Sequence, residues 1–216
     1  MKKKHAEVKC MFLDIGGVLL TDGWELRSRK LAARKFELDF TEFETRHRMT
    51  FETFELGKLT IDDYLNLVVF YEKRSFTRAH FRRFMFDQSK PYPRMIKLIT
   101  DLRNQYHFKV IVVSNEAREL NAHRIQVFKL GKFVDSFISS CFIHARKPDA
   151  DVFQLALDIA QVPIHQIVYL ENTPMFIRVA KALGIRSILH TDYNSTCKAL
   201  ASLGLRQDER IVHDSI

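Results

Sequence analysis

Short apolar runs alternate with longer amphipathic segments through most of the sequence. The apolar runs, each about as long as a buried strand, lie at 10–15, 108–113, 134–138, 167–170 and 186–189. Apolar positions spaced three and four apart predict helices over 94–104, 117–129, 150–160 and 174–183. Because strands that alternate with helices form parallel sheets covered on both faces, the pattern predicts a Rossmann-like α/β fold.

The pattern changes between residues 23 and 87, where helical spacing continues without intervening strands. The helices predicted here span 24–36, 41–55 and 60–72. Thr41 and Thr60 open the second and third, since an acidic residue follows each of them three positions later. Ten of the eighteen phenylalanines lie in this segment, which indicates a separate apolar core or a docking face. We therefore expect a core of residues 1–20 and 88–216 and an all-helical cap of residues 21–87.

Composition places the chain among ordinary globular proteins. Apolar residues make up 46% and charged residues 28% of the 216 positions. The start, MKKKHAEVK, is basic but has no apolar signal core behind it, and no apolar stretch is long enough to span a membrane. The three cysteines are far apart in sequence, which favours reduced thiols. These features predict a cytoplasmic protein without membrane association, with a loosely held polar tail after about residue 204.

The formal net charge of +8 does not by itself identify a partner. Lysine and arginine are scattered through helical segments, apart from Lys2–Lys4 and the pair Arg82–Arg83. Such scattering is typical of solvated helix faces, so no nucleic-acid partner is expected. A small anionic substrate fits the same charge.

Polar side chains follow four of the predicted strands. The motifs are Asp14-Ile-Gly-Gly17, Ser114-Asn115, Arg146-Lys147-Pro148-Asp149 and Glu171-Asn172-Thr173-Pro174. In open parallel sheets, ligands bind beyond the carboxyl ends of the strands. We therefore expect a carboxylate, a hydroxyl, a lysine and a second carboxylate to meet at one edge of the sheet.

Each motif also has a simpler local interpretation. Asp14 could be a turn residue, although Gly16–Gly17 already supplies the turn and an unpartnered buried carboxylate is costly. Ser114–Asn115 could cap a helix, and Pro148–Asp149 could begin one. The segment 171–174 could equally be a helix entrance, with an Asn or Thr cap and Pro in the first turn.

The sequences DIGGVL, VVSN, RKPDADVF and YLENTPMFIRVAKALGI together resemble the four motifs of the haloacid dehalogenase superfamily, in order and across essentially the whole core. The DxGxVL start, the insertion after it, FELGKLTIDDY and LGIRSIL resemble the subfamily IA branch that includes glucose 1-phosphate phosphatases. The resemblance implies a Mg²⁺-dependent phosphatase that acts on a small phosphorylated metabolite, such as a sugar phosphate, through an aspartyl-phosphate.

The resemblance also implies roles for individual residues. The catalytic residues would be Asp14, the nucleophile, and Lys147, which stabilises negative charge. The phosphate would be bound by Gly17, Ser114, Asn115 and Lys147. Mg²⁺ would be held by Asp14, the Gly16 carbonyl, Glu171 and Asn172. This chemistry is coherent, because a carboxylate can attack a phosphoryl dianion only when a cation and hydrogen-bond donors offset the charge.

Two positions depart from the family pattern. Gly16 stands where most of these phosphatases carry a second Asp, the general acid, and Asp22, Glu25 or a metal-bound water could replace it. Glu171-Asn172 stands where two aspartates are usual, which removes one negative charge from the metal site. The alternative is therefore a catalytically impaired relative that binds a phosphorylated ligand or a protein partner. As the reaction of this protein, displacement of a halide is a less favoured prediction than hydrolysis of a phosphate ester.

Overall fold

The computed structural model describes residues 7–208, so Lys2–Lys4 and the last eight residues of the polar tail lie outside the described residues. The strands are β1 (Cys10–Leu13), β2 (Lys109–Ser114), β3 (Ser136–Ser139), β4 (Ile167–Glu171) and β5 (Arg186–Leu189). They form one sheet in the order β3-β2-β1-β4-β5, and every neighbouring pair is parallel. The predicted α/β class with a parallel sheet is confirmed, and β1 is its central strand.

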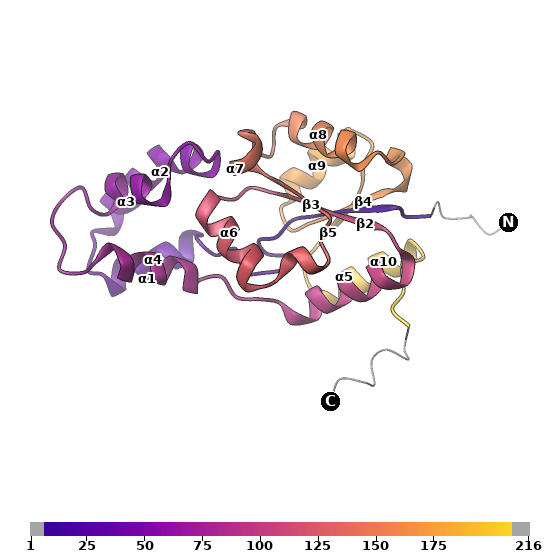
Figure 1. The fold of residues 1–216 in the computed structure, drawn as a ribbon, viewed down its shortest axis with the longest axis horizontal. Coiled ribbons are helices and arrows are strands. Elements are labelled where there is room, and N and C mark those ends of the chain that lie inside the picture. The colour runs from indigo at the N-terminus through magenta and orange to yellow at the C-terminus, as the bar shows by residue number, and fades with distance from the viewer. Residues whose placement is uncertain (1–6, 209–216) are drawn as a thin grey trace.

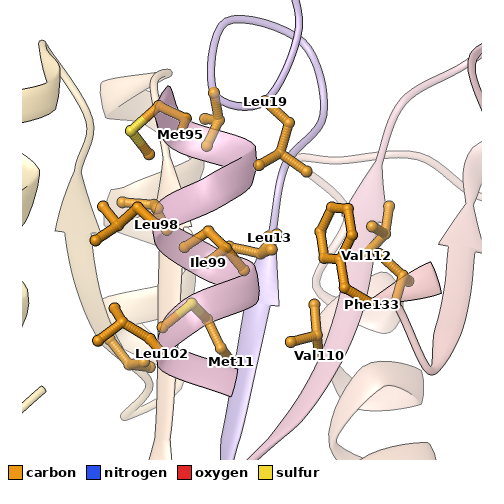
Figure 2. Packing of buried hydrophobic residues seen from close by; sticks show 14 of the residues in the cluster. Met11, Leu13, Leu19, Met95, Leu98, Ile99, Leu102, Val110, Val112 and Phe133 are labelled. Atoms are coloured by element: carbon orange, nitrogen blue, oxygen red, sulfur yellow. The ribbon is translucent and has the colours of Figure 1, made fainter. Parts of the chain in front are cut away.

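Helices cover both faces of the sheet. The face with Met11 and Leu13 packs against α5 (Pro93–Tyr106) and α10 (Tyr193–Ser202), as Figure 2 shows for α5. The opposite face, with Cys10 and Phe12, packs against α8 (Ala150–Ala160) and α9 (Pro174–Ala182). Successive residues of β1 thus point into two different apolar clusters, as a strand buried on both sides requires. Burial of each large side chain contributes about 1.5–3 kcal/mol.

Four helices between β1 and α5 lie together beyond the carboxyl edge of the sheet (Figure 1). They are α1 (Leu26–Lys35), α2 (Phe40–Glu55), α3 (Ile61–Val68) and α4 (Arg78–Asp87), and we call them the helical unit. The unit has its own apolar cluster, in which Phe36, Phe43 and Phe81 are buried. The phenylalanine-rich segment therefore forms a core of its own. The cap boundary at residues 21–87 stays a prediction.

The helix ends differ in part from the sequence-based predictions. Thr60 and Asp63 form the expected capping box at the start of α3, but that helix ends at Val68. The cap of α2 is Asp39, whose side chain accepts from the backbone N–H of Glu42, so the predicted start at Thr41 is wrong. The prediction also missed α4 and α10. In α4 only Phe81 and Met85 are buried, so the apolar stripe is narrow.

The chain leaves and re-enters the sheet region along two adjacent segments. The backbone N–H of Thr21 donates to the carbonyl of Lys90 at 2.9 Å, and the N–H of Tyr92 donates to the carbonyl of Leu19 at 2.8 Å. Leu20 and Pro91 form an antiparallel bridge between these bonds. The two connections are therefore paired as a short ribbon.

The remaining elements are two further helices and two short turns. They are α6 (Arg118–Val127), α7 (Ser140–Ile143) and two 3-10 turns at Leu130–Lys132 and Ile164–Gln166. Over residues 7–208, no helix combines the length and the apolar character needed to cross a bilayer.

Candidate active site

A pocket of about 490 Å³ opens between the carboxyl edge of the sheet and the helical unit. Its floor includes Asp14, Ser114, Asn115 and Asn172, at the ends of β1, β2 and β4, and Lys147, in the loop after α7. Its wall toward the helical unit includes Trp24, Arg29, Glu44, His47, Arg48 and Phe51. The volume is in the range of small-molecule sites, and the expected convergence of polar side chains at one sheet edge is present.

Asp14 directly follows β1, and its backbone N–H donates to the carbonyl of Leu170 at 3.0 Å. Only 8% of the residue is exposed, and one carboxylate oxygen lies 3.0 Å from the Lys147 ammonium. Burial, reinforced by the charge of Glu171, raises the pKa of Asp14 to about 6, although Lys147 and a hydrogen bond from Ser114 oppose the rise. Asp14 is therefore partnered on both sides and is not a simple turn residue.

Lys147 is 1% exposed, and three groups surround its ammonium. The Nζ atom donates to Glu171 at 2.6 Å, to Asp14 at 3.0 Å and to the Tyr169 hydroxyl at 3.1 Å. Burial by itself would lower the pKa of Lys147, but the two carboxylates outweigh it and the pKa is raised. The ammonium thus stays charged next to Asp14.

Asn115 holds the main chain at Lys147. Its side-chain amide donates to the Lys147 carbonyl and accepts from the Lys147 N–H, each at 2.9 Å. The side chain is thereby occupied, so a phosphate contact from Asn115 would have to come from its backbone N–H. Ser114, one residue earlier at the end of β2, is buried beside Asp14.

The two glycines after Asp14 occupy different surroundings. Gly17 has a φ of +69°, and a Cβ there would lie 1.9 Å from the Asn172 amide nitrogen. Only glycine fits this close approach. A Cβ at Gly16 would meet Asp22 Oδ1 at 3.3 Å. The Asp22 carboxylate therefore stands beside the space that an Asp at position 16 would enter.

Asp22 and Glu25, the two carboxylates considered as substitutes for the missing Asp, have different environments. Glu25 also lines the pocket, but its carboxylate accepts from the N–H of Arg27 and caps α1. Asp22 lines the pocket floor and accepts a hydrogen bond from Asn172. Burial, with help from the charge of Glu25, raises the pKa of Asp22, and Arg124 opposes the rise. Asp22 is the better placed of the two.

Glu171 and Asn172 point in different directions. Glu171 is fully buried, with one carboxylate oxygen bound to Lys147 and Tyr169 and the other accepting from the Thr173 N–H at 2.8 Å. It therefore faces Lys147 and the first turn of α9 and does not line the pocket. Asn172 lines the pocket. Pro174 opens α9 as the helix-entrance reading predicts, but the Thr173 side chain makes no capping bond.

Three residues of this region were missed by sequence reasoning. Tyr169 lies two residues before Glu171 on β4, on the same side of the strand, and this spacing was an available signal. Glu116 and Arg124 form a buried ion pair at the pocket edge. Burial raises the pKa of Glu116 to about 7 despite Arg124. No motif marks this pair, because it joins a loop to the last turn of α6.

The pocket floor offers some, but not all, of the oxygen ligands that a divalent cation such as Mg²⁺ needs. Over residues 7–208, no three acidic, histidine or cysteine side chains cluster closely enough to form a metal site by themselves. The pocket floor does present oxygen-bearing groups at Asp14, Gly16, Asp22 and Asn172. Oxygen ligands supplemented by water are what Mg²⁺ prefers. Glu171 could bind the same cation only if it gave up its hydrogen bond to Lys147 or to the Thr173 N–H.

The family of the chain follows from its sequence. Residues 8–201 match the haloacid dehalogenase-like hydrolase family, so the chain belongs to that family of hydrolases. No curated protein shows significant similarity to the sequence.

Solved structures share the fold at low sequence identity. The haloacid dehalogenase family enzyme bt-2542 of Bacteroides thetaiotaomicron superposes with a TM-score of 0.73 at 16% identity, over 85% of this chain and 94% of that chain. A predicted HAD-like family hydrolase of Porphyromonas gingivalis gives a TM-score of 0.73 at 15% identity, over 94% of this chain and 100% of that chain. The L-2-haloacid dehalogenase of Xanthobacter autotrophicus gives 0.59 at 13% identity, over 92% and 84%. At these identities the likeness establishes the fold.

Proposed function

We propose that this protein is a Mg²⁺-dependent phosphatase that hydrolyses a small phosphorylated metabolite, such as a sugar phosphate, with Asp14 as the nucleophile. The observation that carries the proposal is the position of Asp14 at the pocket floor, with Lys147 at 3.0 Å. Lys147 is the buried cation that such a nucleophile needs beside it. The bacterial enzyme bt-2542 has been crystallised with magnesium and inorganic phosphate, which supports phosphate chemistry on this fold.

The charges around the floor favour a divalent cation. Asp14 and Glu171 share one cation, Lys147, and the carboxylate of Asp22 lies beside Gly16. Glu116 and Arg124 pair with each other. A dianionic phosphoryl group would enter this region only if further positive charge accompanied it. Bound Mg²⁺ would supply that charge and polarise the phosphoryl oxygens, held by Asp14, Gly16 and Asn172 with water.

Residues of the chain itself would carry out nucleophilic attack, phosphate binding and proton transfer. The Asp14 carboxylate attacks phosphorus, the P–O bond to the alcohol breaks, and an aspartyl-phosphate forms. Ser114 and the backbone N–H groups of Gly17 and Asn115 would bind phosphoryl oxygens, while Lys147 offsets the charge on Asp14. Asp22 would give a proton to the departing alkoxide and later take one from water, the task of the Asp absent at position 16.

A direct test compares wild type and Asp14→Asn on p-nitrophenyl phosphate and a panel of sugar phosphates, with and without Mg²⁺. We expect Mg²⁺-dependent release of phosphate by wild type and a loss of at least about 10³-fold in the variant. Hydrolysis that survives Asp14→Asn would count against the proposal. Beryllium fluoride should also form a stable acyl-phosphate mimic on Asp14, visible by ¹⁹F NMR in wild type and absent in the variant.

A second candidate function is binding of a phosphorylated ligand or a protein partner without turnover. The specific observations that favour it are Gly16 and Asn172, since both replace acidic residues of the family pattern. Saturable binding of sugar phosphates without release of phosphate would identify this function. Halide displacement, the chemistry of the Xanthobacter enzyme, would be revealed by chloride release from L-2-chloropropionate, and we expect none.

A further inference from the structure

His47 lies in the pocket wall formed by the helical unit, away from the catalytic floor. It belongs to α2, is 7% exposed, and lines the pocket together with Trp24 and Phe51. Its Nδ1 atom lies 2.9 Å from the Tyr64 hydroxyl. The same hydroxyl accepts from the indole N–H of Trp24 at 2.9 Å. Three side chains from α2, α3 and the segment before α1 thus form one hydrogen-bonded chain.

The direction of this chain fixes the position of the imidazole proton. The indole of Trp24 can only donate, so the Tyr64 oxygen is an acceptor there. Tyr64 is fully buried, and its hydroxyl hydrogen would be left without an acceptor unless it pointed to His47 Nδ1. Nδ1 of His47 is therefore the acceptor, and a neutral imidazole then carries its hydrogen on Nε2.

Several features hold His47 neutral and in place. Burial, together with the charges of Arg29 and Arg48, lowers the pKa of His47 to about 4, although Glu44 opposes the shift. The ring of Tyr64 stacks on Phe54 with centroids 4.3 Å apart, which limits movement of the hydroxyl. The imidazole is therefore a neutral group of fixed orientation around neutral pH.

The remaining ring nitrogen of His47 faces the pocket. Within residues 7–208, the Nε2 atom of His47 has no hydrogen-bond partner. The surrounding protein nevertheless does not bury this atom completely. Because His47 lines the pocket, we infer that this N–H is accessible from the pocket. Next to it, Phe51 is tilted by 30° against the imidazole, with ring centroids 5.4 Å apart. The wall thus offers one neutral donor beside an apolar ring face.

We propose that His47 is a specificity-determining residue whose Nε2–H donates to an oxygen of the substrate's alcohol part, while that part packs on Phe51. This inference rests on the proposed function, because a phosphoryl group on the floor directs the alcohol part toward this wall. The substrate class is a phosphate monoester whose ring-shaped alcohol part carries hydroxyl or carbonyl acceptors.

The test measures binding in the Asp14→Asn background, so that it does not depend on turnover. Glucose 1-phosphate and cyclohexyl phosphate are both six-membered-ring monoesters, but the second has no acceptor on its ring. We expect the first to bind more tightly by calorimetry in the presence of Mg²⁺. Adding His47→Phe should reduce the ratio of the two affinities about tenfold, the loss of one neutral hydrogen bond worth about 1.4 kcal/mol.

Two further variants separate recognition from a structural role. His47→Gln keeps an N–H donor of similar reach and should recover part of the affinity ratio. His80 is a second, exposed histidine of the helical unit that does not line the pocket, and His80→Phe should leave the ratio unchanged. ¹⁵N NMR of the imidazole in the unliganded protein should show the hydrogen on Nε2 near neutral pH.

The outcomes are distinct. The proposal is overturned by a hydrogen on Nδ1, by an affinity ratio that does not respond to His47→Phe, or by failure of both esters to bind. Failure of the phosphatase proposal would appear elsewhere, as absence of turnover by wild type. A reduced ratio in His47→Phe would still support recognition by His47 in that case.

Discussion

Asn115 and Lys147 exchange two hydrogen bonds, each 2.9 Å long, between one side-chain amide and both polar groups of one backbone residue. The end of β2 is thereby tied to the loop that carries the buried ammonium. The position of the Lys147 side chain next to Asp14 depends on this link as well as on the charges at the floor.

Asn115→Ala should therefore lower kcat more than it changes KM. It removes two partly buried hydrogen bonds to the loop that carries Lys147, which costs about 1–3 kcal/mol of folding free energy. The Lys147 ammonium would also be less well held beside Asp14, and misplacement of a catalytic group slows the chemical step. Urea unfolding and steady-state kinetics of the variant measure the two effects. Unchanged kcat would show that the loop holds Lys147 without this link.

Lys147→Met should be strongly destabilising at neutral pH. Met has a similar length but no charge, so Asp14 and the fully buried Glu171 would face each other without a cation. Removal of one partner from a buried ion pair costs about 3–5 kcal/mol. Urea denaturation should show this loss, and adding Glu171→Gln should recover part of it. A loss below about 1 kcal/mol would contradict the inferred charge balance.

Adjacent glycines provide a matched pair of substitutions. Gly17→Ala would place a Cβ 1.9 Å from Asn172 in a backbone with φ of +69°, so we expect a loss of roughly 2–4 kcal/mol. In Gly16→Ala the nearest atom to the new Cβ would be Asp22 Oδ1 at 3.3 Å, and the substitution should cost about 1 kcal/mol or less. Thermal unfolding of both variants tests the ranking, and equal losses would show that the turn adapts.

Asp22→Asn should slow the hydrolysis of esters with poor leaving groups. Alkyl and sugar alkoxides need a proton on departure, whereas p-nitrophenolate does not, so the loss should be about 10²–10⁴-fold for the first and smaller for the second. The comparison requires kcat/KM for both substrates in the presence of saturating Mg²⁺. An equal loss for both would indicate that Asp22 serves metal binding instead.

The pH dependence of stability should reveal the neutral state of His47. Its pKa is about 4 in the folded protein and about 6.5 when unfolded, so the unfolded chain binds more protons between these values. The stabilisation is complete above pH 6.5 and is lost as the pH falls through 4, by about 2–3 kcal/mol. Relative to His47→Gln, wild type should lose this amount between pH 7 and pH 4. Parallel stability curves for the two proteins would refute the assignment.

The sequence predicted the sheet well because buried parallel strands leave short, uninterrupted apolar runs. It placed Asp14, Ser114 and Lys147 at one edge, since the carboxyl ends of parallel strands meet there. The local direction of side chains was not accessible in the same way. Glu171 and Asn172 are adjacent in sequence, yet one faces Lys147 and the other the pocket, because successive residues after a strand diverge.

The pocket wall was beyond sequence reasoning for a different reason. His47, Tyr64 and Trp24 come from three separate segments, and only the packing of the helical unit brings them into contact. Helical periodicity identifies such residues as buried, but it does not say which of their polar atoms meet. The same holds for Arg124, whose partner Glu116 lies in a loop.

The ribbon formed by residues 19–21 and 90–92 has a mechanical consequence. Because its two strands are hydrogen-bonded to each other, the four helices cannot swing on one connection while the other stays still. The Arg124 guanidinium also donates hydrogen bonds to the Thr21 carbonyl of this ribbon and to the hydroxyl of the neighbouring Ser89. A tilt of the helices over the pocket would therefore have to move both connections together, and it would also have to change the ion pairs that join Arg146 to Glu52 and Glu55 of α2.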